Sequence, residues 1–228
     1  MKLYDQYLFL LVHLKGLLTH GFRRFAYGQW AEDLLIGGLA PEKQGFYIDI
    51  GAFHPMHYSN TYLLYKRGWR GIAVDPNAST GTLFRIHRPR DIFVQSGVGA
   101  TSQVLPYYVF NHQSCNTFSE AHRDRMLARP FMRLIRTEKV AIAPLTDIVA
   151  AHAPHQKVDV LNIDVEGMNL AVLESNDWST CVPRVICVED DDLVITKDSV
   201  ASPIHTYLSA RGYSLRERAG QSSLYTHG

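Results

Sequence analysis

Two acidic residues follow short apolar segments near residue 50. Asp49 lies near the end of a β-rich run at 46–50, and Asp75 directly follows a second apolar run at 71–74. Acids at the carboxyl ends of two strands lie at the edge where open α/β sheets bind ligands. Because one carboxylate can accept hydrogen bonds from both hydroxyls of a ribose, Asp75 predicts a nucleoside site.

The segment between these acids has the composition of a turn followed by a helix. Gly51 and Ala52 allow a tight turn with little side-chain bulk. The sequence Ser-Asn-Thr at 59–61 can cap a helix that runs to about residue 67. We therefore predict a strand–turn–helix–strand unit over residues 46–75.

The residues of the turn narrow the class of nucleoside. A dinucleotide site has the pattern G-x-G-x-x-G, but Phe53 and Met56 stand at the second and third glycine positions, and no P-loop sequence occurs. Asp49 beside the turn would repel a phosphate, whereas it can accept a hydrogen bond from an ammonium group. A cationic nucleoside without phosphates, such as S-adenosylmethionine, fits best. The alternative is an ordinary βα unit without a ligand.

Strands and helices alternate along the rest of the chain. Further strands or extended segments are predicted at 92–98, 104–110, 158–164 and 184–189, with a closing hairpin of 213–215 and 223–226. Helices are predicted at 79–87, at 119–136 with an interruption at Pro130, and at 146–151, 166–174 and 204–211. This alternation is typical of an α/β fold with a doubly wound, mostly parallel sheet.

Five strings of this sequence resemble one protein family. They are GQWAEDLL (28–35), YIDIGAFHPMHYSNTYLLYKRGWRGIAVDPN (47–77), QSGVG (95–99), LNIDVEGMNLAVL (161–173) and VICVED (185–190). With these strings the chain resembles the FkbM family of S-adenosylmethionine-dependent methyltransferases. The resemblance implies a class I, Rossmann-like fold with an antiparallel last strand. It also implies methyl transfer to a hydroxyl of a sugar, a glycan precursor or a natural product.

The resemblance assigns roles to residues near the expected strand ends. Cofactor contacts are expected from Asp49, Gly51, Ala52, Asn60, Asp75 and Ser96. The string that holds Gln29, Glu32 and Asp33 either caps a helix or belongs to a lid over the cofactor. The acceptor hydroxyl needs a base, for which Asp164 and the loop residue His57 are the candidates.

A second group of acids follows the strands predicted at 158–164 and 184–189. Asp164 ends the first of them, and Glu189 and Asp190 end the second. This arrangement resembles magnesium-dependent O-methyltransferases, and carboxylate oxygens suit Mg²⁺, so these three residues are the predicted metal ligands. The alternative is a solvated acidic loop, since two more aspartates follow. Glu166 is expected in the first turn of a helix, where the helix dipole favours a carboxylate.

Arginines give residues 119–136 a positive bias. They are Arg123, Arg125, Arg129, Arg133 and Arg136, interleaved with methionines and leucines. Such a segment is either a solvated amphipathic helix or a cap that attracts an anionic acceptor, such as a phosphate-bearing sugar carrier. Lys and Arg number 23 against 22 for Asp and Glu, a balance that argues against nucleic acid as a partner.

Length and composition suggest one domain over residues 1–228, with a helical extension at 1–44 and a catalytic core at 45–228. Apolar residues at 7–18 have helical spacing but are too few to span a bilayer, and no signal-peptide cleavage site follows. This helix is expected to pack on the domain, on a second subunit or on a membrane surface. Three cysteines without a paired motif favour the reducing cytoplasm.

Two other functional classes stay open. A non-catalytic nucleoside-binding or scaffold protein could have the same fold, and only turnover with an acceptor separates it from an enzyme. An NAD-dependent oxidoreductase is disfavoured by the missing glycines. The cofactor that the protein binds, NAD or S-adenosylmethionine, distinguishes an oxidoreductase from a methyltransferase.

Overall fold

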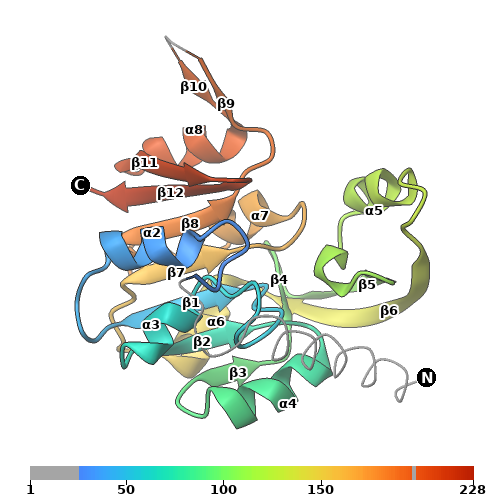
Figure 1. The fold of residues 1–228 in the computed structure, drawn as a ribbon, viewed down its shortest axis with the longest axis horizontal. Coiled ribbons are helices and arrows are strands. Elements are labelled where there is room, and N and C mark those ends of the chain that lie inside the picture. The colour runs from blue at the N-terminus through green and yellow to red at the C-terminus, as the bar shows by residue number, and fades with distance from the viewer. Residues whose placement is uncertain (1–25, 197–198) are drawn as a thin grey trace.

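A seven-stranded sheet forms the centre of the protein in the computed structural model, which describes residues 26–196 and 199–228 (Figure 1). Its strand order is β11-β12-β8-β7-β1-β2-β3. The strands that pair in parallel with a neighbour are β1 (Phe46–Ile50), β2 (Arg70–Val74), β3 (Ile92–Val94), β7 (Val160–Ile163) and β8 (Val185–Glu189). The last strand, β12 (Ser222–His227), runs antiparallel to β8 and to β11 (Tyr213–Ala219). The mostly parallel sheet and the antiparallel last strand are thus confirmed.

Helices cover both faces of this sheet. One face carries α2 (Glu32–Leu39), α3 (Tyr62–Lys66) and α4 (Ala78–His87). The other carries α6 (Leu145–His152), α7 (Asn169–Glu174) and α8 (Pro203–Ser209). Successive side chains of β1 point to opposite faces. Ile48 and Ile50 therefore join the core under α6 and α7, whereas Tyr47 joins the core under α2 and α3.

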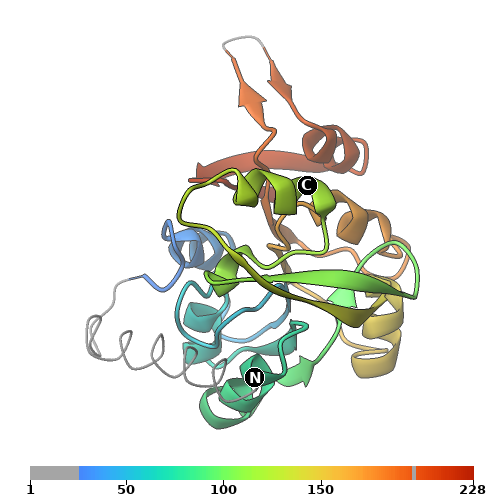
Figure 2. The ribbon, with the colours of Figure 1, turned by 90° about the vertical axis from the view of Figure 1, so that its right-hand side faces the viewer.

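Residues 97–143 form a second, smaller sheet with two helical segments, which we call the arm. Its strands are β4 (Gly97–Val98), β5 (Gln103–Phe110) and β6 (Leu134–Ala143), and β5 and β6 pair as a long antiparallel ribbon. Between β5 and β6 the chain forms η1 (Gln113–Cys115) and α5 (Glu120–Leu127). Figure 1 shows the arm extending from one end of the main sheet, and Figure 2 shows it face on.

The arm corrects two predictions from the sequence. Residues 92–98 are not one strand, because the chain leaves the main sheet after β3 and β4 pairs with β6 instead. The helix predicted at 119–136 ends at Leu127, and residues 134–143 form β6, whose partner β5 lies about 30 residues away in the sequence. Long-range strand pairing therefore overrides local helix propensity in this segment.

A small hairpin of β9 (Val194–Ile195) and β10 (Val200–Ala201) projects from the end of the molecule near α8 (Figure 1). The helix predicted at 7–18 lies outside the described residues, and the division into 1–44 and 45–228 stays a prediction. All three cysteines are free thiols. Within residues 26–196 and 199–228, no helix combines the length and the hydrophobicity that crossing a lipid bilayer requires.

Candidate active site

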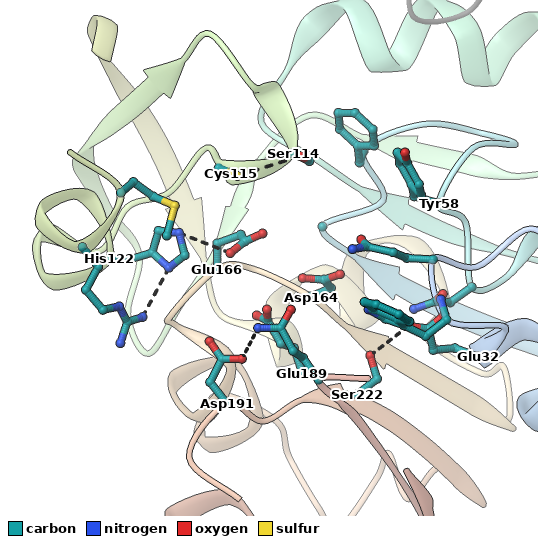
Figure 3. A pocket seen from close by; sticks show the side chains of 18 of the residues that line it. Glu32, Tyr58, Ser114, Cys115, His122, Asp164, Glu166, Glu189, Asp191 and Ser222 are labelled. Atoms are coloured by element: carbon teal, nitrogen blue, oxygen red, sulfur yellow. Dashed lines mark hydrogen bonds and ion pairs between the residues drawn. The ribbon is translucent and has the colours of Figure 1, made fainter. Parts of the chain in front are cut away.

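A cavity of about 500 Å³ opens where the carboxyl ends of the parallel strands face the arm (Figure 3). Gly51, Asp164 and Glu189 line it from the ends of β1, β7 and β8. His122 and Met126 line it from α5 of the arm. Its volume lies within the range of roughly 300–1,000 Å³ that is usual for small-molecule sites.

Gly51 makes the close approach between β1 and β7 possible. It has a φ of 80°, and a Cβ atom at this position would lie 1.8 Å from the carbonyl oxygen of Asp164. Only glycine adopts this conformation without strain, and no larger residue fits against that carbonyl. The backbone N–H groups of Gly51 and Ala52 both donate to the carbonyl of Val74, which fixes the turn against β2.

The loop after this turn, residues 53–60, holds two residues in an unusual conformation. Phe53 and Tyr58 have φ values of 44° and 54°, in the left-handed region that bulky residues rarely adopt. Each such residue costs about 1–3 kcal/mol and persists only where surrounding contacts impose it. Phe53, Tyr58 and Asn60 all line the cavity. The strain therefore lies in the wall of the candidate site.

Asp75 is buried and lines neither this cavity nor a second one, but its hydrogen-bond partners line one cavity each. Its two oxygens accept backbone N–H bonds from Phe53 at 2.9 Å and from Asn77 at 2.8 Å. Phe53 lines the first cavity, whereas Asn77 lines the second, which has a volume of about 450 Å³ and is also lined by Gln95, Tyr107 and Asn116. Burial raises the pKa of Asp75 to about 6.

Three further residues predicted to contact a cofactor line neither cavity. Asp49 is buried and accepts hydrogen bonds from Thr61 Oγ1 at 2.5 Å and from Asn162 Nδ2 at 2.9 Å. Ala52 packs in a small core with Phe84. The Ser96 hydroxyl donates to the carbonyl of Gly97 within the arm. Of the predicted set, Gly51 and Asn60 line the first cavity, whereas Asp75 lines neither cavity and contacts the walls of both through Phe53 and Asn77.

Three carboxylates meet at the floor of the first cavity. Oxygens of Asp164, Glu166 and Glu189 lie within 4.8 Å of one another (Figure 3). Burial raises the pKa of Asp164 well above its usual range, and repulsion from Glu189 adds to this effect. The same causes raise the pKa of Glu166 to about 9. At neutral pH the group must therefore retain at least one proton or bind a cation.

The composition of this acid cluster differs from the predicted one. Asp190 turns away to accept a hydrogen bond from Ser202 Oγ at 2.6 Å, and that hydroxyl also caps α8. Glu166 is not in the first turn of a helix, because α7 begins only at Asn169. Instead it has a φ of 51° in a turn before Gly167, which directs its side chain into the cavity. Glu166 thus takes the place that the sequence assigned to Asp190.

The histidine that faces the cavity is not the predicted one. His57 is buried with its ring 4.6 Å from the ring of His54, and it does not line the cavity. His122 on α5 does, with Nε2 3.3 Å from Glu166 Oε2 and Nδ1 3.3 Å from an Arg125 nitrogen. An arginine can only donate, so Nδ1 accepts, and neutral His122 carries its proton on Nε2, which lies near Glu166 without meeting the geometry of a hydrogen bond. Burial and Arg125 lower the pKa of His122.

No sequence motif marks His122, because its proximity to Glu166 depends on how the arm folds back over β7. The Thr117 hydroxyl donates to the carbonyl of Glu166 at 2.7 Å, and this bond joins the arm to the turn after β7. The one sequence signal for His122 was that it is a basic residue in a segment predicted to cap the site.

The string before β1 makes no side-chain cap of α2, and its role as a lid over a cofactor stays a prediction. Asp33 accepts backbone N–H bonds from Tyr27 and Gly28, and Glu32 accepts one from Trp30, so both residues fix the start of α2. Glu32 also lines the cavity, where it accepts a hydrogen bond from Ser222 Oγ at 3.3 Å. Gln29 lines the cavity as well.

The arginines of the arm divide into different environments. Arg125 and Arg129 line the first cavity, and Arg136 lines the second while it pairs with Glu138. Arg123 pairs with Asp124 at 2.7 Å, and Arg133 is exposed and lines neither cavity. The positive charge that reaches the first cavity therefore comes from Arg125 and Arg129.

Comparisons with known proteins relate this chain to one family. The profile of the methyltransferase FkbM domain matches residues 49–215. The crystal structure of methyltransferase FkbM from Methylobacillus flagellatus KT is similar with 14% identity and a TM-score of 0.48, over 91% of this chain and 45% of that one. The C-terminal domain of precorrin-6Y C5,15-methyltransferase from Rhodobacter capsulatus is similar with 16% identity and a TM-score of 0.40, over 86% of each chain. The chain thus spans less than half of the first structure's length. No curated protein matches it significantly.

Proposed function

The chain belongs to the FkbM methyltransferase family, and we propose that it transfers a methyl group from S-adenosylmethionine to a hydroxyl of a sugar, a glycan precursor or a natural product. The observation that carries this proposal is the acid cluster of Asp164, Glu166 and Glu189, which faces a cavity beside the Gly51 turn. The cluster offers negative charge for a cationic cofactor and a proton acceptor for a hydroxyl. Both are needed at one place for methyl transfer to oxygen.

The charge of the first cavity supports a cationic ligand without phosphates. Six acids line it: Glu32, Asp164, Glu166, Glu189, Asp191 and Asp192. The basic residues in its lining are His122, Arg125 and Arg129. When bound, S-adenosylmethionine supplies an electrophilic methyl group on a positively charged sulfur and also carries an ammonium group. A dinucleotide with its pyrophosphate would meet repulsion at the acid cluster.

The position of Asp75 supports a cofactor that extends over both cavities. A carboxylate oxygen has two lone pairs, so Asp75 can hold Phe53 and Asn77 and still accept bonds from ribose hydroxyls. The second cavity offers the amides of Gln95 and Asn116 and the ring of Tyr107, groups that suit an adenine. We therefore place adenine in the second cavity and the methionine portion near Gly51 and Asn60.

Asp164 is the residue that we propose as general base. Its side chain lines the cavity, whereas His57 does not. The raised pKa of Asp164 makes it a stronger proton acceptor than an exposed aspartate, and a nearby positive charge would favour its ionised form. Asp164 would take the hydroxyl proton while the walls of the cavity hold the acceptor oxygen in line with the methyl group.

A divalent cation is a second proposal for the same cluster. Asp164, Glu166 and Glu189 are hard oxygen ligands of the kind that Mg²⁺ prefers, and such an ion would remove their mutual repulsion. It would also lower the pKa of an acceptor hydroxyl. Loss of turnover in EDTA and its recovery with Mg²⁺ would support the metal. Full turnover in EDTA would leave Asp164 as the base.

The residues at the mouth of the cavity suit an acceptor that is polar and contains a ring. Trp30 and Tyr58 line the cavity while 55% and 53% of their surfaces stay exposed, which leaves flat apolar faces free for a sugar ring. Arg125 and Arg129 on the arm add positive charge from the other side. We propose an acceptor with several hydroxyls and an anionic group.

Methyl transfer from labelled S-adenosylmethionine tests the proposed function. The purified protein is incubated with sugars, nucleotide-linked sugars and natural products, and transferred label is measured together with released S-adenosylhomocysteine. Calorimetric titrations with S-adenosylhomocysteine and NAD⁺ run beside it. Binding of S-adenosylhomocysteine and labelled product support the proposal. Binding without turnover would indicate a non-catalytic nucleoside-binding protein, and binding of NAD⁺ alone would indicate an oxidoreductase.

A further inference from the structure

Arg88, directly after α4, has a completely buried guanidinium group. The side chain is 0% exposed, and it lies over the rings of Phe84, Tyr47 and Tyr65 at 4.8–5.3 Å. A buried guanidinium is stable only when its N–H donors find acceptors. Arginine has five such donors, and the structure provides five acceptors on two different sides.

One side of the fork-shaped guanidinium group is directed toward the core. Nε donates to Asp91 Oδ2 and one terminal nitrogen donates to the hydroxyl of Tyr47, both at 2.6 Å. Asp91 also accepts from Tyr47 and from the backbone N–H of Gly71 at 3.0 Å. These contacts compensate the charge of Arg88 and tie it to β1 and β2.

The other side of the fork is directed toward the loop that forms the cavity wall. The remaining donors reach the carbonyl of Pro55 at 3.4 Å, Ser59 Oγ at 3.2 Å and Thr61 Oγ1 at 3.0 Å. All three acceptors lie in or just after residues 53–60, the loop with two left-handed residues. The three contacts thus fix a segment whose backbone is under strain.

A chain of hydrogen bonds continues from this fork to the cavity surface. Thr61 Oγ1 accepts from Arg88 and donates to Asp49 Oδ2, while Asp49 Oδ1 accepts from Asn162 Nδ2. Asn162 Oδ1 in turn accepts from Asn60 Nδ2 at 3.1 Å, and Asn60 lines the cavity. Each member of the chain holds the next in one orientation.

We propose that Arg88 is a positioning residue for cofactor binding, which holds residues 53–61 in the conformation that forms the cavity wall. Arg88 does not line either cavity, so it acts through Ser59, Thr61 and the chain that ends at Asn60. The inference rests on the proposed function in that it takes the first cavity as part of the cofactor site. It gives the buried Asp49 a role as a link in this chain rather than as a direct ligand.

A lysine at this position separates positioning from charge compensation. Arg88→Lys keeps the positive charge beside Asp91, but a single ammonium nitrogen cannot serve both the core side and the loop side of the fork. Ser59→Ala removes one loop acceptor and leaves the core side intact. Tyr47→Phe is the matched control, because it removes an acceptor on the core side only.

Two measurements on these variants test the inference. Hydrogen exchange of the free protein should be faster in residues 53–61 of Arg88→Lys, where the backbone N–H groups of Met56 and His57 bond to His54 Nδ1, and unchanged in β1. Calorimetry below the unfolding temperature should show S-adenosylhomocysteine binding weakened at least about tenfold in Arg88→Lys. Ser59→Ala should change both readouts in the same direction by less, and Tyr47→Phe should bind within about twofold of wild type.

The outcomes distinguish this inference from the proposed function. Unchanged exchange in residues 53–61 of Arg88→Lys would overturn the inference. Equal weakening of binding in Tyr47→Phe would also overturn it, since Arg88 would then be a general stabiliser of the fold. A wild-type protein that binds no S-adenosylhomocysteine would instead reject the proposed function, and the exchange measurement would still decide whether Arg88 positions the loop.

Discussion

Two groups of carboxylates in the same sheet have opposite surroundings. Around Arg88, the carboxylates of Asp49 and Asp91 accept hydrogen bonds at both of their oxygens. At the cavity, Asp164 and Glu166 face Glu189, and no hydrogen bond to the side chain of Asp164 is found within the part of the chain that the structure describes. Hydrogen bonds therefore compensate the negative charges of the first group. In the second group, the fold holds carboxylates close together although they repel one another.

The difference shows how this fold separates structure from chemistry. Compensated charge fixes the loop at 53–60 in place, whereas burial, together with mutual repulsion, raises the pKa of the cavity acids. Perturbed carboxylates gather where a ligand or a reaction needs them. The comparison predicts that a substitution around Arg88 lowers stability, whereas a substitution in the acid cluster lowers turnover without lowering stability.

The largest expected effect is on stability. Arg88→Ala leaves Asp91 buried without its cation and should lower the free energy of unfolding by about 3–5 kcal/mol. Asp164→Asn removes a repelling charge and should leave that free energy unchanged or raise it. Urea unfolding of both variants measures the difference. A loss of stability in Asp164→Asn as large as in Arg88→Ala would contradict the claim that the two groups differ in charge compensation.

The second prediction concerns turnover. Asp164→Asn removes the proposed base and should lower kcat by a factor of about 10²–10⁴. Calorimetric affinity for S-adenosylhomocysteine should change little, since the ribose and adenine contacts remain. Unaltered kcat in this variant would assign proton removal to another group, for which Glu166 and His122 are the neighbours.

The third prediction concerns pH. The pKa of Glu166 is raised from 4.5 to about 9 in the folded protein, so the folded state holds this proton more tightly than the unfolded chain. Its contribution to stability is complete below pH 4.5 and is lost as the pH rises toward 9. Between pH 6 and pH 9, wild type should therefore lose at least about 1.4 kcal/mol more stability than Glu166→Gln, the equivalent of one pKa unit. If the free energy of unfolding changed equally with pH in the two proteins, the raised pKa of Glu166 would be contradicted.

The smallest expected effect is on acceptor binding. Arg129→Ala should raise KM for an anionic acceptor about threefold, since an exposed charge contributes up to about 1 kcal/mol. Arg133→Ala is the matched control, because Arg133 is exposed and lines neither cavity. The effect should shrink at high salt, where exposed charges are screened. An equal rise of KM in both variants, or with a neutral acceptor, would reject a specific role for Arg129.

The sequence predicted the parts of the fold that depend on local pattern. The run at 46–50, the turn at Gly51 and the acid after the second strand are all read from adjacent residues, and the structure places them as expected. The position of Asp164 at the end of β7 follows from the same reasoning. Alternating apolar runs and helices were sufficient to predict the doubly wound sheet.

The parts that could not be predicted depend on distant contacts. β6 pairs with β5 across a segment that contains α5, and no local signal shows that pairing. Glu166 enters the cavity because it adopts a left-handed conformation although it is not a glycine, and its carbonyl accepts a hydrogen bond from Thr117 of the arm. Asp190 leaves the cavity because its carboxylate accepts a hydrogen bond from the hydroxyl of Ser202, twelve residues later.

Calorimetric titration with S-adenosylhomocysteine tests the central claim most directly. The wild type should bind saturably if, as we propose, the carboxyl edge of the sheet forms a nucleoside site around Asp75. Asp75→Ala removes charge-assisted bonds worth roughly 1.5–3 kcal/mol each. It should weaken binding at least about tenfold, while thermal unfolding confirms that the variant is folded. Absence of binding in the wild type, or equal affinity in Asp75→Ala, would contradict this account of the site.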